Sequence, residues 1–266
     1  MNHFIFRSCL LVAILLLGAF FRLYNSNWDQ NFHLHPDERF LTMVGNAMKM
    51  PQSIGDYFNP ATSLFNPANI GFSFYVYGIL PLILNLLISL FLNHANYTDF
   101  TLQGRMLSAI ADIIIIFLVY KSAQLFEKRY ELPHSFPYVA AFFYTIAILP
   151  IQLSHFFTVD MFLTLFAFAS FYFACRFALH HSWINLLFSA VFLGFALASK
   201  ISAIFIAPFI MFTTQLSFLT LREIKLPFIS SQSTSRLRRQ IAQIGYMLFS
   251  IIFFLGIVYL ILRISD

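Results

Sequence analysis

Charged residues are scarce in this chain. Only 10% of its 266 residues are Asp, Glu, Lys or Arg, whereas soluble proteins average about 25%. Hydrophobic residues make up 59%, and phenylalanine alone contributes 36 residues. Several uncharged runs approach the roughly 20 residues that a helix needs to cross a bilayer. These features exclude a soluble globular fold and predict an all-α integral membrane protein.

Cysteine is rare as well, and the few basic residues are not gathered on one face. The two cysteines, Cys9 and Cys175, each lie inside an apolar run, so a disulfide framework is not indicated. The net charge of +5 comes from Lys and Arg at the ends of apolar runs, without a basic face interleaved with aromatic residues. Nucleic-acid binding is therefore not expected. No internal repeat is visible, so residues 1–266 are expected to form one transmembrane module.

Charge-poor runs mark the candidate membrane helices. No small-residue cleavage pattern follows the first run, which favours an uncleaved transmembrane helix over a signal peptide. Counted simply, there are eight such runs: 4–24, 70–93, 101–120, 136–157, 161–179, 183–198, 201–219 and 241–262.

The positive-inside rule changes this count. Three basic clusters should be cytoplasmic, namely 121–129, Arg176 and the loop 220–240. Eight full crossings would place them outside. We therefore expect 70–93 to be re-entrant or to lie along the interface, since Gly78 and Pro81 permit a kink. About seven spans remain.

The resulting topology gives the outer face most of the polar residues. The extracytoplasmic face receives the loop 25–100, the turns at 154–160 and 199–200, and the C-terminus. Within the long loop, residues 36–50 have the spacing of an amphipathic helix. We expect this helix to lie along the membrane surface.

The first candidate site is an acidic pair in the long loop. Asp37 and Glu38 follow Pro36, which suits the first position of a helix. Both carboxylates should be ionised there, because free backbone amides and the helix dipole favour negative charge. The pair could be a functional site or only the cap of a surface helix.

A second carboxylate and a lysine should share that face of the membrane. Asp160 is expected at an outward junction between two apolar helices, where it could act on a substrate or cap a helix. Lys200 ends the run Gly194 to Lys200 and must either reach the interface or meet an anion.

Three further residues remain ambiguous. Arg105 and Asp112 are seven residues apart on one helix, so they share similar faces and suggest a structural ion pair. His155 could donate to a substrate phosphate or could simply pack. His35, beside the acidic pair, is a further candidate for substrate binding.

The order of these features resembles that of GT-C glycosyltransferases, in particular the protein O-mannosyltransferases and the lipid A aminoarabinose transferases. Those proteins carry an Asp-Glu pair soon after the first helix, which Asp37 and Glu38 match. An Arg-led helix, a second acidic residue and a Gly-Ala-rich helix ending in Lys follow, which Arg105, Asp160 and Lys200 match in order. The resemblance covers roughly residues 1 to 220.

The resemblance implies a GT-C-like helical bundle and a chemistry. The donor would be a sugar on a polyprenyl phosphate, transferred with inversion to a glycan, lipid or protein acceptor at the extracytoplasmic face of the cell membrane. Asp37 would be the general base, and Glu38 and Asp160 would orient the acceptor or the sugar. Lys200, and secondly Arg105, would stabilise the leaving phosphate, with His155 and His35 also near the substrate. The segment 70–93 would line the lipid groove.

Some alternatives stay open at this stage. The chain could instead transport a lipid-linked sugar along a path through Asp112, Arg105 and Lys200, or serve as a scaffold that binds glycolipid without turnover. No cofactor is expected, and although a divalent metal is left open, His33, His35 and Asp37 do not form a recognisable metal pattern. Relatives usually continue for several more helices. Part of the fold is therefore expected to be missing, and a partner subunit could supply it.

Overall fold

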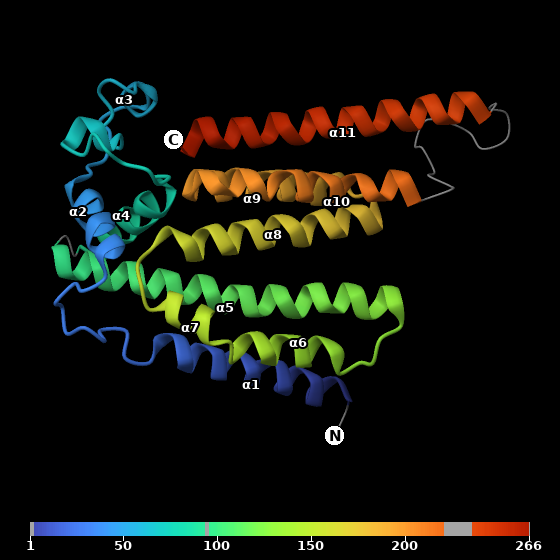
Figure 1. Ribbon diagram of the computed structural model, residues 1–266, viewed down its shortest axis with the longest axis horizontal. Coiled ribbons are helices and arrows are strands. Elements are labelled where there is room, and N and C mark those ends of the chain that lie inside the picture. Colours follow the sequence, from blue (N-terminus) through green and yellow to red (C-terminus); the bar gives the residue numbers. More distant parts are fainter. Residues whose placement is uncertain (1–2, 94–95, 221–235, 266) are drawn as a thin grey trace.

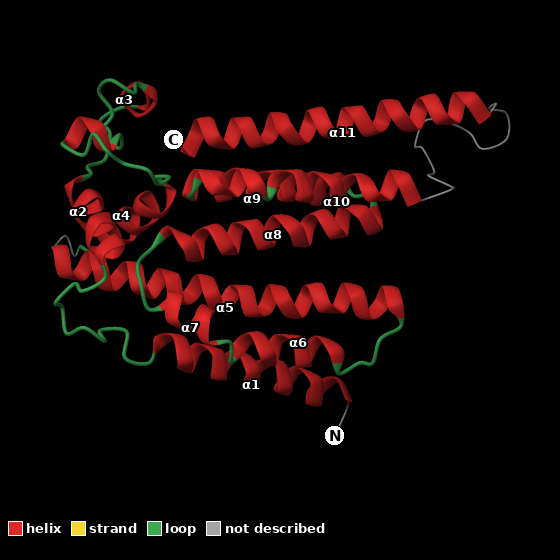
Figure 2. Cartoon of the chain, in the orientation of Figure 1, coloured by secondary structure: helices red, strands yellow, loops and turns green. Residues whose placement is uncertain are grey.

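The computed structural model describes residues 3–93, 96–220 and 236–265, and in these ranges every regular element is a helix (Figure 2). The all-α prediction is confirmed. The long helices lie side by side in one bundle (Figure 1). In chain order, the helices are α1 His3–Leu23, α2 Pro36–Ala47, α3 Ile54–Phe58, η1 Pro67–Ile70, α4 Leu80–Leu92, α5 Tyr97–Tyr130, α6 Phe136–Thr145, α7 Ile148–Ser154, α8 Val159–His180, α9 Trp183–Ser199, η2 Ile201–Phe205, α10 Ala207–Thr220 and α11 Arg236–Ser265.

Apolar length identifies the membrane helices among them. Four helices, α1, α5, α8 and α11, are long and apolar enough to cross a bilayer. The helices α6 and α7 together form a fifth candidate, bent by 56° at the break between them. The shorter apolar helix α9 and the segment η2–α10 occupy the positions of the two other expected spans. The count of seven remains a prediction.

The bundle has two chemically different ends. Successive long helices run in alternate directions, so α2, α3, α4, the beginning of α8 and the end of α11 lie at one end, which we call the site end (Figure 1). The opposite end, which we call the basic end, carries Lys121, Lys128, Arg129 and Arg176. The predicted loop 220–240 lies largely outside the described residues.

Residues 70–93 do not form one continuous helix. A stretch without regular secondary structure, 72–77, leads to α4, which has 13 residues and is therefore only about 20 Å long. Pro81 lies in the first turn of α4, where a missing N–H costs little, rather than at a kink within a helix. The Asn85 amide donates to the Phe100 carbonyl at 2.7 Å, which fixes α4 against α5. Helix α2 ends at Ala47, three residues before the expected end at residue 50.

Apolar packing holds α2 and α4 against the bundle. Val44 of α2, Leu82 of α4 and Phe157 before α8 are each fully buried in one cluster. A second cluster joins α8, α9, α10 and α11 through side chains such as Phe177, Leu186 and Phe254. The helices α2 and α4 at the site end therefore pack directly against the long helices.

A buried ion pair lies where α6 breaks. The Arg22 Nε donates to Asp112 Oδ2 at 2.6 Å, and both side chains have no exposed surface. Arg22 also donates to the carbonyls of Thr145 and Tyr144 at the end of α6. The Tyr144 hydroxyl donates to Asp112 Oδ1 at 2.6 Å. The expected pairing of Asp112 with Arg105 is therefore wrong, because α1 supplies a nearer arginine.

This pair generates a stability prediction. Asp112→Asn should lower the melting temperature of the detergent-purified protein by about 10 °C, because breaking a buried pair costs about 3 to 5 kcal/mol and leaves Arg22 uncompensated. Asp99→Asn, at the half-buried start of α5, is the matched control and should shift melting by less than half as much. Equal shifts in the two variants would show that the Arg22 pair is not a special constraint.

Candidate functional site

The first turn of α2 separates the two predicted carboxylates. His35 precedes the helix, and its Nδ1 accepts from the Glu38 backbone N–H at 3.3 Å. Pro36 takes the first helical position. Because neighbouring helical residues point about 100° apart, Asp37 faces outward and is exposed whereas Glu38 is completely buried. The two acids therefore have different surroundings.

Glu38 belongs to a buried cluster around Arg105. The Arg105 guanidinium donates to both Glu38 oxygens, at 2.8 and 2.6 Å, and to both Asp29 oxygens, at 3.0 and 2.8 Å. A further bond, at 3.0 Å, goes to the Ser26 carbonyl. These bonds use all five guanidinium N–H groups, so none is left for a substrate phosphate. The Trp28 ring covers the guanidinium at 5.3 Å from its centroid.

Asp29 was missed by the sequence reasoning. The Arg105 hydrogen bonds lower the pKa of its carboxyl to about 2, and burial opposes that shift. Asp29 also accepts from the backbone N–H groups of Asn31 and Leu34, which shapes the loop before α2. One signal could have revealed it, since an arginine near the start of an apolar helix needs a carboxylate partner.

Glu38 also positions the beginning of α8. Its Oε1 accepts from the Phe157 backbone N–H at 2.7 Å, three residues before Asp160. Asp160 lies in the first turn of α8, and its Oδ1 accepts from Lys200 Nζ at 2.8 Å. Both side chains remain about one-third exposed. The structure thus places Asp160 and Lys200 together at the site end.

Tyr77 connects this pair with Asp37. Lys200 Nζ lies 6.0 Å from the centroid of the Tyr77 ring. Burial raises the pKa of the Tyr77 phenol, the charges of Asp37 and Asp160 and a side-chain hydrogen bond to Asp37 raise it further, and Lys200 opposes the shift. Three predicted site residues, Asp37, Asp160 and Lys200, therefore surround one tyrosine. The sequence reasoning missed Tyr77, although the aromatic run 72–77 was a usable signal.

Gly78 explains how Tyr77 reaches this position. Its backbone N–H donates to the Ser199 carbonyl at 3.1 Å, next to Lys200. A Cβ on Gly78 would lie only 1.8 Å from the Ala198 carbonyl oxygen, so the backbone approach requires glycine. The end of α9 therefore holds the loop in place.

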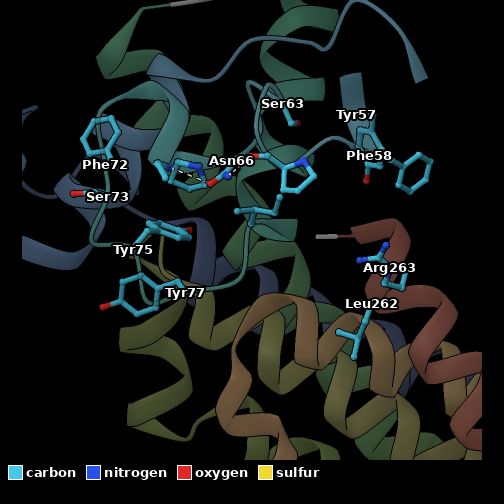
Figure 3. Close-up of a pocket in the computed structure, with 14 residues that line it drawn as sticks. Tyr57, Phe58, Ser63, Asn66, Phe72, Ser73, Tyr75, Tyr77, Leu262 and Arg263 are labelled. Carbon is cyan, nitrogen blue, oxygen red and sulfur yellow. Dashed lines mark hydrogen bonds between the residues drawn. The ribbon is translucent and has the colours of Figure 1, made fainter. Parts of the chain in front are cut away.

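A cavity of about 460 Å³ opens beside Tyr77 (Figure 3). The loop 57–79 forms most of its wall, and Leu262 and Arg263 of α11 close another side. Figure 3 shows Tyr75 and Tyr77 at one end and Tyr57 and Phe58 near α11. The wall thus combines aromatic rings with polar groups from Ser63, Asn66, Ser73 and Arg263.

The two predicted histidines lie on different segments, His35 just before α2 and His155 between α7 and α8. His35 packs against Phe156 with the two rings tilted by 31° and their centroids 4.3 Å apart. The two ring nitrogens of His155 lie 2.8 and 3.0 Å from the carbonyl oxygens of Ile151 and Tyr24. These contacts orient both rings. In the described ranges no three His, Cys, Asp or Glu side chains group so that they could hold a metal ion.

The different burial of Asp37 and Glu38 can be tested by matched substitutions. Glu38→Gln should lower the melting temperature by several degrees, because it removes a buried charge that Arg105 and the Phe157 N–H both require. Asp37→Asn should change it by no more than about 2 °C, as expected for an exposed position. Thermal unfolding in detergent measures both, and the reverse ranking would contradict the arrangement of α2.

One comparison with known proteins identifies a family. A family model described as dolichyl-phosphate-mannose-protein mannosyltransferase matches residues 80–260, more than half of the chain, and that range includes Arg105, Asp160 and Lys200 but not α2. No curated protein and no solved structure matches the chain. The resemblance to GT-C enzymes is confirmed. The chain belongs to the dolichyl-phosphate-mannose-protein mannosyltransferase family and is an integral membrane glycosyltransferase of the GT-C type.

Proposed function

We propose that the protein transfers a sugar from a polyprenyl-phosphate donor to an acceptor hydroxyl at the extracytoplasmic face, with inversion at the anomeric carbon. The observation that supports this most is the meeting of Asp37, Tyr77, Lys200 and Asp160 at the site end. Nucleotide sugars are cytoplasmic, so a site on the outward face requires a lipid-linked donor. The family description, which names a dolichyl phosphate sugar, supports the same class.

Asp37 is the general base in this proposal. Its exposed carboxylate takes the proton of the acceptor hydroxyl while the acceptor oxygen forms a bond to the anomeric carbon. The bond from that carbon to the phosphate oxygen breaks, and the phosphate leaves with the electron pair. The raised pKa of Tyr77 keeps its phenol protonated beside Asp37, so the phenol does not compete for the proton.

Lys200 receives the leaving phosphate. Its ammonium lies beside Asp160 and is about one-third exposed, so an incoming phosphate can approach it without displacing a buried contact. The positive charge stabilises the negative charge that grows on the phosphate in the transition state. Asp160 holds the lysine in position and is available to a hydroxyl of the donor sugar.

The cavity of about 460 Å³ receives the acceptor. It borders Tyr77, and its rings and hydroxyl and amide groups suit a ligand with both apolar faces and hydroxyls. Arg105 and Glu38 act differently from the expectation. They position α2 and α8 from inside the protein and do not contact the substrate.

The transporter alternative gains no support from the geometry. Asp112 is buried against Arg22, and Arg105 is enclosed by Asp29 and Glu38 in a separate cluster. Lys200 lies with Asp160 at the site end. The three residues therefore do not line one path through the bundle.

Replacement of the base gives the decisive activity prediction. Asp37→Asn should reduce transfer from dolichyl phosphate mannose by about 100-fold or more, the usual range for loss of a general base, while membrane insertion is unchanged. The assay measures dolichyl phosphate release in membranes that contain the protein. Asp99→Asn removes a carboxylate at the start of α5 that hydrogen-bonds to Asn96. It is the matched control and should retain activity.

Two results would overturn the proposal. Full activity of Asp37→Asn would remove the base role. Stoichiometric binding of dolichyl phosphate mannose without release of dolichyl phosphate by the unsubstituted protein would instead favour the scaffold alternative.

A further inference from the structure

A second polar cavity lies at the basic end, far from the site just described. Its volume is about 200 Å³, and it lies between α5 and α8, which pack along their length. The basic end is the end opposite α2 and α4 (Figure 1). The cavity is lined mainly by Lys121, Gln124, Lys128, Tyr172, Arg176 and His180.

The lining of this cavity is strongly positive. Three cationic side chains face it, and none of the lining residues is acidic. Lys121 lies close enough to Lys128 and Arg176 to be repelled by both. In the described part of the chain none of these three cations takes part in an ion pair. Like charges gathered without a counter-ion are unfavourable, so the cluster favours an anion.

The cavity also has the features of an ordered binding site. Lys121 and Arg176 are half-buried, and Tyr172 is 5% exposed. The Lys121 ammonium donates to Gln124 Oε1 at 3.0 Å, and the Arg176 guanidinium lies 5.8 Å from the Tyr172 ring centroid. These contacts hold two cations on neighbouring helices, where one tetrahedral anion can reach both.

We propose that this cavity binds a phosphate group, presented by the headgroup of an anionic membrane lipid or by a free phosphate. Under the positive-inside rule the basic end lies at the cytoplasmic surface, where anionic headgroups are concentrated. The site is separate from sugar transfer, because Asp37, Tyr77 and Lys200 lie at the other end of the bundle.

Lipid-dependent stability tests this site without an activity assay. In nanodiscs, replacing part of the phosphatidylcholine by phosphatidylglycerol should raise the melting temperature of the unsubstituted protein by several degrees. The double variant K121Q/R176Q should lose that rise. R129Q removes one charge from the same end, at an exposed residue outside the cavity, and should retain the rise.

Inorganic phosphate distinguishes the two sources. If phosphate added to phosphatidylcholine nanodiscs produces an equal rise, the ligand is the free anion; if only phosphatidylglycerol does, it is the lipid. The proposal would be overturned if neither probe raised the melting temperature. It would also be overturned if the melting temperatures of K121Q/R176Q and R129Q rose equally. If the double variant does not fold, the single variant K128Q is used instead and bound lipid is counted by native mass spectrometry. K128Q should then retain fewer phosphatidylglycerol molecules than R129Q.

Discussion

The Arg105 guanidinium and its two buried carboxylates are the interaction on which the site end depends. Arg105 is anchored in α5, Asp29 in the loop after α1, and Glu38 in α2. Glu38 also accepts from the backbone just before α8, so one buried carboxylate fixes two segments that carry Asp37 and Asp160. A charged group at this depth is tolerated because every N–H of the guanidinium is satisfied. The placement of Asp37 and Asp160 is therefore supported from inside the protein by a buried network of hydrogen bonds and ion pairs.

The second support comes from close backbone approach. Gly78 lies against the end of α9 and brings Tyr77 beside Lys200, which in turn pairs with Asp160. Charge and packing therefore cooperate: the ion cluster places the two carboxylates, and the glycine contact places the tyrosine and the lysine between them. At the opposite end the cations have no such neutralising partners among their cavity neighbours. The two ends consequently suit different ligands.

The sequence predicts the meeting of Asp37, Asp160 and Lys200 well, because an antiparallel series of apolar helices brings alternate junctions to one end. It predicts individual partners poorly. The seven-residue spacing suggested that Arg105 pairs with Asp112. In the structure Asp112 pairs with Arg22 of α1, and Arg105 pairs with Glu38 of α2 and with Asp29 in a loop. Helical periodicity within α5 cannot identify partners on other segments. Tyr77 was missed for a related reason: its position depends on the path of an irregular segment, which no repeating pattern encodes. The acidic pair matched its motif, but only the helix geometry separates the buried Glu38 from the exposed Asp37.

The central claim is that the site end faces outward. Its most direct test labels single cysteines with a membrane-impermeant maleimide in intact cells, after Cys9 and Cys175 have been replaced. Exposed positions suit this test, with Gln52 and Asn93 at the site end and Arg129 and His180 at the basic end. The account predicts labelling of cysteines at 52 and 93 and protection of those at 129 and 180. Labelling at 129 and 180, with 52 and 93 protected, would place the candidate site in the cytoplasm and contradict a lipid-linked transfer at the outer face.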